Sequence, residues 1–204
     1  MRARVLLRAA ALAPAFLLAA SPPALAHMPA GANAFYGGVV HAVSGIEQIL
    51  LLAAFGLFIG LMEEERLFRH FGAFMAGIVL GGIAGLFLGG ADGMAPFLAA
   101  NLAVLGGLVA LGGLPDDIAD RRAALGLSAL FGLAMGSANV VPLPAGWSPI
   151  LYFGGVLIIG AFAVNLVAQL TARARTGWRR IGIRVLGSWV AAVGVIQAML
   201  AALT

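Results

Sequence analysis

The sequence of 204 residues contains no cysteine and no lysine, and all 12 of its basic residues are arginine. Without thiols, disulfides and thiolate metal sites are both excluded. Charge is scarce as well, because only 10% of the residues are charged whereas 62% are hydrophobic. A soluble domain is about half apolar and about a quarter charged. These proportions therefore indicate an integral membrane protein.

The N-terminal stretch "MRARVLLRAAALAPAFLLAASPPALAH" has the parts of a secretory signal peptide in their usual order. Arginines come first, a short apolar run follows, and Ala24, Leu25 and Ala26 give the small-residue cleavage signal. The apolar run is too short for a comfortable membrane span. We therefore expect residues 1–26 to be a signal peptide and residues 27–204 to be the mature domain. An uncleaved anchor helix is the alternative.

Long apolar segments fill the rest of the chain, each near the roughly 20 residues that cross a bilayer as a helix. There are six of them, at about 35–62, 71–90, 96–114, 123–141, 149–171 and 181–203. No sequence repeat relates the two halves, so an inverted-repeat transporter is not indicated. The predicted fold class is all-α, an integral membrane bundle of six transmembrane helices after a cleavable signal peptide.

The arginines of the mature chain occur in alternate connections between these segments. They lie in 63–70, 115–122 and 172–180, with Arg184 just inside the last segment, and are missing from 91–95 and 142–148. A cleaved signal places the mature N-terminus outside, and the positive-inside rule independently places the same three arginine-bearing connections in the cytoplasm. We therefore expect a multi-pass protein of the bacterial inner membrane with both mature termini in the periplasm. The arginines then need no nucleic-acid partner.

Glycines recur every four residues in the second segment, at Gly77, Gly81, Gly85 and Gly89. This spacing places small residues along one face of a helix and lets a neighbouring helix approach closely. We interpret these four glycines as helix-packing residues.

Polar side chains stand in the first half of the first segment, where His41, Ser44, Glu47 and Gln48 occur within two helical turns. On a continuous helix they form a stripe that runs from the outer leaflet towards the midplane. Ionisable residues at membrane depth are costly and usually functional, and imidazole and carboxylate groups bind divalent first-row metals. We interpret the stripe as half of an access route from the outside. Helix packing for Ser44 and interhelical hydrogen bonding for Gln48 are the alternatives.

Other polar residues are interpreted separately from this stripe. After cleavage His27 offers a free amine and an imidazole, a pair that chelates copper or nickel, although a disordered terminus is the alternative. His70, next to Arg69, is expected at the membrane interface. The remaining amides in or near the apolar segments are interpreted as mostly structural: Asn101, Asn139, Asn165, Gln169 and Gln197.

The plan of the chain resembles the HupE/UreJ family of hydrogenase- and urease-accessory membrane proteins. The shared features are a signal peptide that ends just before a histidine and six helices in about 200 residues. The family's first helix typically reads His-Pro-x-x-Gly-x-Asp-His. Here His41 and Gly45 match, Glu47 is a conservative change, and Ala42 and Gln48 depart.

The second family motif, His-Gly-x-Ala-His-Gly-x-Glu, is largely lost in the fourth segment, which reads "FGLAMGSAN". Phe131 and Met135 stand where the family has histidines, and Ala138 stands at the carboxylate position. The resemblance implies a permease that carries nickel, or a similar divalent cation, across the inner membrane to a metalloenzyme maturation system. It implies no tightly bound cofactor, because the cation is cargo.

The ligand set implied for this chain is His41, Glu47, Gln48 and Met135, with Ser44 as a secondary contact. Such a set is softer and poorer in imidazole than the family's, which brings copper and cobalt into consideration beside nickel. The main rival is a scaffold or assembly subunit that does not transport and that binds partner helices, or a second copy of the chain, through the glycine groove. A proton or small-solute channel based on Glu47 alone is a third hypothesis.

No enzymatic activity is expected. Rhomboid proteases share six helices and a serine in the fourth, where this chain has Ser137, but a serine nucleophile requires a general base. The last segment, residues 181–203, contains no histidine to act as that base. A bis-histidine haem site is excluded as well, because His41 is the only histidine well inside the predicted membrane region.

Overall fold

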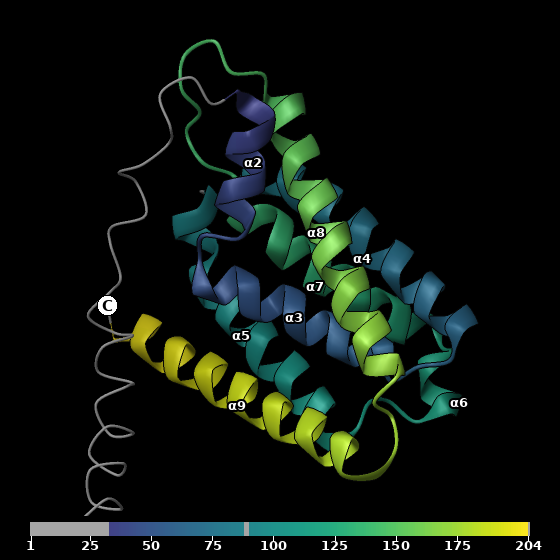
Figure 1. Cartoon of the computed structure of the whole chain (residues 1–204). Helices are drawn as coiled ribbons and strands as arrows, with labels where there is room; N and C mark the ends of the chain where they lie inside the picture. Colours follow the sequence, from purple (N-terminus) through teal and green to yellow (C-terminus); the bar gives the residue numbers. More distant parts are fainter. Residues whose placement is uncertain (1–32, 88–89, 204) are drawn as a thin grey trace, which may run out of the picture. The chain divides into compact units, whose positions relative to one another are not determined.

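The computed structural model describes residues 33–87 and 90–203, with the backbone alone for residues 90–94. In this part of the chain all regular elements are helices (Figure 1), which confirms the all-α prediction there. They are α2 Ala34–Ala42, α3 Ile46–Gly60, α4 Glu64–Gly85, α5 Gly90–Leu111, α6 Asp116–Ala119, α7 Arg122–Ala138, α8 Pro149–Ala172 and α9 Gly177–Ala201. The predicted signal peptide and His27 lie outside the described residues.

Three described helices, α4, α8 and α9, are long and apolar enough to cross a membrane. A fourth span would result if α2 and α3 crossed together as one bent pair. Two further apolar helices are shorter: α7, with 17 residues, and the part of α5 from Ala95 to Leu111. Length and composition thus give three or four candidate spans in the described residues, where the sequence predicts six.

The first predicted segment, residues 35–62, is broken into two helices. α2 ends at Ala42, α3 begins at Ile46, and the helices are bent by 75° at the break. The Ser44 hydroxyl donates to the carbonyl of His41 at 2.9 Å, so it satisfies the end of α2 and does not extend the helix. The prediction of one continuous stripe from His41 to Gln48 is therefore wrong, because it assumed an unbroken helix.

Other predicted boundaries shift for a common reason, which is that charged residues take part in helices. α4 begins at Glu64 and ends at Gly85, whereas the sequence predicted 71–90. Glu64 and Glu65 occupy its first turn, where the helix dipole favours negative charge. The expected connection at 91–95 forms part of α5, and the connection at 115–122 contains α6.

The hydrophobic core is built around α3, which contacts α4, α5, α7, α8 and α9 (Figure 1). Phe55 of α3 stacks on Phe74 of α4, with ring centroids 4.1 Å apart. Phe131 of α7 meets both Phe55 and Phe58 at a steep angle between the rings. All four rings are fully buried, so this aromatic cluster fixes α3 in the middle of the bundle.

The glycine groove of α4 is occupied by α7. A Cβ on any of four glycines in this interface would overlap a backbone carbonyl oxygen of the other helix: Gly77 against Ala129, Gly81 against Leu133, Gly132 against Phe74 and Gly136 against Ile78. Gly85 lies against Val140 and Ser137, while Gly89 lies outside the described residues. The two backbones therefore touch directly, as small residues at fourfold spacing permit.

The three arginine-bearing connections meet at one end of the bundle, which we call the arginine end. Arg66 of α4 bonds to Asp120, at 3.1 Å, in the connection between α5 and α7. Arg175, between α8 and α9, donates to the carbonyl of Gly60 at 2.9 Å. Arg184 of α9 donates to the carbonyl of Ala110 in α5 at 2.7 Å. The contacts of Arg175 and Arg184 cap the C-terminal ends of α3 and α5, whose last carbonyls lack helical partners.

The arginine-free end is formed by residues 139–148, which connect α7 to α8, and by the C-terminal turns of α9. α5 and α9 pack closely along their length, since Gly187 lies against Ala110 near the arginine end and Gly194 lies against Ala103 further along. The two helices therefore run antiparallel, and the first turns of α5 lie beside the last turns of α9. Together these elements surround the site described next.

Candidate functional site

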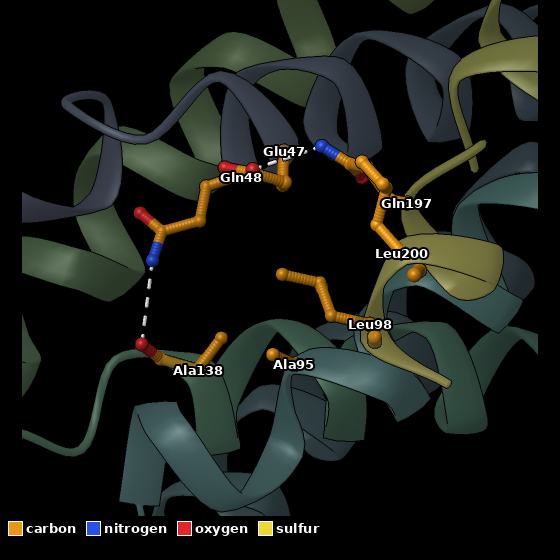
Figure 2. Close-up of a pocket in the computed structure, with 9 residues that line it drawn as sticks. Glu47, Gln48, Ala95, Leu98, Ala138, Gln197 and Leu200 are labelled. Carbon is orange, nitrogen blue, oxygen red and sulfur yellow. Dashed lines mark hydrogen bonds between the residues drawn. The ribbon is translucent and has the colours of Figure 1, made fainter. Parts of the chain in front are cut away.

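A partly open pocket of about 370 Å³ lies towards the arginine-free end. It is lined by residues of four helices: Glu47 and Gln48 of α3, Ala95, Leu98 and Ala99 of α5, Ala138 of α7, and Gln197, Leu200 and Ala201 of α9. Figure 2 shows the three polar side chains along one side of this pocket and the aliphatic ones along the other. The pocket therefore joins a polar wall to an apolar wall.

Glu47 is the acidic residue among the side chains that the structure describes around the pocket. The break at residues 43–45 places it in the first turn of α3, where the N-terminal end of the helix dipole favours a carboxylate. Its Oε1 accepts a hydrogen bond from Nε2 of Gln197 at 2.8 Å. None of the ion pairs in the described part of the chain involves Glu47. An amide, not a cation, thus partners this carboxylate.

Gln48 is buried beside it, with 8% of its surface exposed. Its Nε2 donates to the carbonyl of Ala138 at 3.3 Å, and so caps the last residue of α7. The Oε1 atoms of Gln48 and Gln197 are both buried and have no hydrogen-bond partner. Buried acceptors are normally satisfied by protein or by ordered water. The pocket wall thus combines a carboxylate with two amide oxygens that lack donors.

His41 lies on α2 at the edge of this arrangement and is not among the residues that line the pocket. Its Nε2 is buried without a hydrogen-bond partner. The ring centroid lies 6.1 Å from that of Tyr152, whose hydroxyl is buried and also has no partner. His41 therefore lies beside Tyr152 and outside the lining of the pocket.

The remaining predicted ligands lie elsewhere. Ser44 is exposed, and its hydroxyl is occupied by the carbonyl of His41. Met135 is fully buried in the core and does not line the pocket. In residues 33–87 and 95–203, whose side chains are described, no group of three histidine, aspartate or glutamate side chains is placed to hold a metal ion. The structure thus brings together Glu47 and Gln48, with His41 adjacent, but not Ser44 or Met135.

Gln197 is the residue of this site that the sequence analysis assigned to a structural role. It is 150 positions from Glu47 in the chain, and yet it forms the one side-chain hydrogen bond that the structure gives to that carboxylate. Its local sequence, "VGVIQAMLA", carries no motif. The available signal was its polarity within an apolar helix, which is unusual in a lipid-facing segment.

His70 is a second buried polar residue whose environment was not predicted. It is 1% exposed, within α4, and both ring nitrogens have partners. Its Nε2 lies 3.0 Å from the carbonyl of Ala119 and its Nδ1 lies 2.7 Å from the hydroxyl of Ser128. A carbonyl can only accept, so Nε2 carries the proton and Nδ1 accepts from Ser128. His70 is therefore an internal clamp at the arginine end and not a residue at the lipid interface.

Comparison with known proteins yields one finding. The family model described as "HupE / UreJ protein" matches residues 15–197, which include both helices of the broken first segment and the three polar side chains of the pocket. This confirms the resemblance that the first motif suggested. Comparisons with curated proteins and with solved structures find no match.

Proposed function

The chain belongs to the HupE/UreJ family, and from this premise we propose that it is a bacterial inner-membrane permease for a divalent transition metal. Nickel is the first candidate for the cargo, with cobalt and copper as alternatives, and the cation would supply the assembly of a metalloenzyme. The observation that carries the proposal is the pocket in which the Glu47 carboxylate faces a space shared with two amide side chains. A carboxylate in such a position offsets the charge of a cation that leaves water.

The position of the pocket fits uptake from the periplasm. The pocket lies towards the arginine-free end, whereas the arginine-bearing connections gather at the other end. Arginine-rich connections face the cytoplasm, so the pocket would open towards the outside. A cation arriving from the periplasm would reach the Glu47 carboxylate in this pocket, with His41 at the end of α2 close to it.

The break between α2 and α3 adds support from backbone chemistry. Discontinuous helices form the ion sites of many membrane transporters, because their ends expose backbone dipoles to the cargo. Here the break separates His41, at the end of α2, from Glu47, at the start of α3. The carboxylate at the start of α3 and the imidazole at the end of α2 are the groups that a cation would contact.

The proposed topology has six spans: α2 with α3 as a bent pair, then α4, α5, α7, α8 and α9. With 17 residues, α7 is at the short end of the length that crosses a bilayer. An even number of spans after a cleaved signal peptide would leave both mature termini in the periplasm. His41, Glu47 and Gln48 are the proposed ligands, while the placement of Ser44 and Met135 gives them no part in it.

Substitution of Glu47 tests the proposal. We expect Glu47→Gln to lower the initial rate of radiolabelled nickel uptake into cells by about tenfold or more, since ligand-shell changes cost about 10–100-fold in metal affinity. Glu65→Gln is the matched control, because Glu65 is an exposed glutamate in the first turn of α4. Both variants should be present in the membrane at the wild-type level. Uptake by Glu47→Gln at the wild-type rate would overturn the proposal.

The scaffold hypothesis has one observation in its favour, which is that no three-ligand metal cluster occurs among the side chains that the structure describes. The groove on which it relied is not free, however, because α7 fills the groove at Gly77 and Gly81. A scaffold would therefore need another surface. It would also tolerate Glu47→Gln, so the uptake measurement separates the two functions.

A further inference from the structure

We propose that Gln197 is a gating ligand of the cation site, which holds the Glu47 carboxylate when no cation is present and coordinates the cation when one arrives. This inference rests on the proposed function and adds to it a specific residue from the last helix. Gln197 lies outside both histidine motifs of the family. The argument depends on the contacts of its two amide atoms.

The two ends of the Gln197 amide have opposite environments. Nε2 donates to Oε1 of Glu47 at 2.8 Å, and Oε1 of Gln197 is buried with no partner. In Figure 2 the Gln197 amide nitrogen lies next to the Glu47 carboxylate at the polar side of the pocket. In this orientation the amide competes with a cation for the carboxylate, while the amide oxygen of Gln197 forms no hydrogen bond.

Turning the amide reverses this arrangement. A rotation of half a turn about the bond to the carboxamide carbon places Oε1 where Nε2 now lies. That orientation is unfavourable with an empty site, because two oxygen acceptors would then face each other. A divalent cation between them removes the repulsion and binds both oxygens, since carboxylate and carbonyl oxygens both coordinate such ions. Cation binding and the amide rotation are therefore coupled.

The backbone beneath Gln197 is fixed, so the change is confined to the side chain. Gly194, almost one turn earlier on α9, packs directly against the backbone of Ala103 in α5. Glu47 is likewise held on α3, and its neighbour Gln48 is bonded to the end of α7. The pocket of about 370 Å³ beside the two side chains leaves room for the amide to turn.

The resulting site has a defined chemical character. The Glu47 carboxylate and the rotated Gln197 amide would supply oxygen ligands, and the Gln48 Oε1, which has no partner, lies on the same wall. Oxygen ligands suit hard divalent cations, whereas imidazole suits nickel, copper and zinc. The pocket would thus accept a partly hydrated divalent cation, and selection for a borderline metal would fall to His41 at the end of α2.

The test is an equilibrium titration of Ni²⁺ and of Ca²⁺ into the purified full chain in detergent. We expect Gln197→Leu, which removes both amide atoms, to weaken Ni²⁺ binding by about tenfold. We expect Gln197→Glu, which can only coordinate, to strengthen binding, with a larger gain for the hard Ca²⁺ ion than for Ni²⁺. Asn101→Leu is the control, because Asn101 is a buried amide bonded within its own helix, to the carbonyl of Phe97 at 2.8 Å.

The outcomes separate this inference from the permease itself. If Glu47→Gln abolishes binding but neither Gln197 variant changes the Ni²⁺ affinity or the Ca²⁺-to-Ni²⁺ preference, the gating role is wrong and the permease stands. Loss of thermal stability in both Gln197 variants without a change in selectivity would likewise overturn the gate, because it would mark Gln197 as a structural link. If the wild-type chain binds neither ion, both the gating role of Gln197 and the proposed cation site are wrong.

Discussion

Two histidines of this bundle differ in whether their ring nitrogens have hydrogen-bond partners. His70 has a partner for each ring nitrogen, on α6 and α7. His41, by contrast, keeps a buried Nε2 without a hydrogen-bond partner. A saturated imidazole stabilises a fold, whereas one with a free lone pair is available to a ligand. The hydrogen bonds therefore give His70 a structural role, whereas His41 stays a proposed ligand.

A substitution at His70 checks the structural half of that assignment. His70→Ala should reduce the free energy of unfolding by about 3 kcal/mol, because it leaves the Ser128 hydroxyl and the Ala119 carbonyl buried without partners beside a new cavity. The measurement is denaturant unfolding of the purified chain in detergent micelles. Ser128→Ala should cost less than this, and the double variant should cost less than the sum, since the two side chains share one bond.

A near-neutral His70→Ala variant would contradict this assignment. It would mean that water replaces both bonds, so that the clamp at the arginine end would be open to solvent. Nickel uptake is the second readout, because a purely structural His70 should leave the uptake per folded molecule unchanged.

At the scale of elements, the α4–α7 pair is held by direct backbone contact. Only glycine fits at position 77, because a Cβ atom at Gly77 would overlap the carbonyl oxygen of Ala129. Gly72, earlier on the same helix, has no atom within 4 Å of such a Cβ. The same helix therefore supplies both a test position and its control.

Alanine at these two glycines should have opposite effects. We expect Gly77→Ala to destabilise the chain by about 1–3 kcal/mol, as overpacking of a close contact does. Gly72→Ala should be neutral or should stabilise the chain by up to about 1 kcal/mol, because alanine favours the helix over glycine. Thermal unfolding of the two variants in the same detergent measures the difference. Equal midpoints would show that α4 and α7 are not in backbone contact.

The elements differ in how well a single sequence predicts them. The spacing of Gly77, Gly81 and Gly85 is a local signal, and it indicated a close helix neighbour before any coordinates. The break at residues 43–45 has no proline to mark it here, although the family motif carries one where this chain has Ala42. The rotation of 100° per residue applies only within one continuous helix. The predicted stripe of polar side chains therefore does not continue across this break.

Contacts between residues far apart in the chain could not be predicted from the sequence, for a different reason. Glu47 and Gln197 meet across 150 positions, and His70 meets Ser128 across 58. Periodicity gives the face of a helix on which a residue lies but not which helix that face meets. The pocket could therefore be half predicted, from α3, while its wall from α9 required the structure.

At the scale of the whole molecule, charge and packing divide the chain into two ends. Every described arginine that bonds across elements lies at one end: Arg66, Arg69, Arg175 and Arg184. The pocket wall lies towards the other end, beside the end of α7 and the end of α9. Between the two ends lies α3, whose aromatic cluster at Phe55 and Phe58 fills the middle of the bundle.

The orientation of these ends in a membrane can be measured directly, because the chain has no cysteine of its own. Single cysteines at Asp117, Ala145 and Thr176 would stand at exposed positions in three successive connections. In intact spheroplasts, a maleimide that cannot cross the membrane should label Ala145→Cys alone, and permeabilisation should add the other two.

Labelling at positions 117 and 145 on the same side would show that α7, with 17 residues, does not span. Labelling of position 176 but not 145 before permeabilisation would invert the topology, and the pocket would then open to the cytoplasm, as suits export and not uptake.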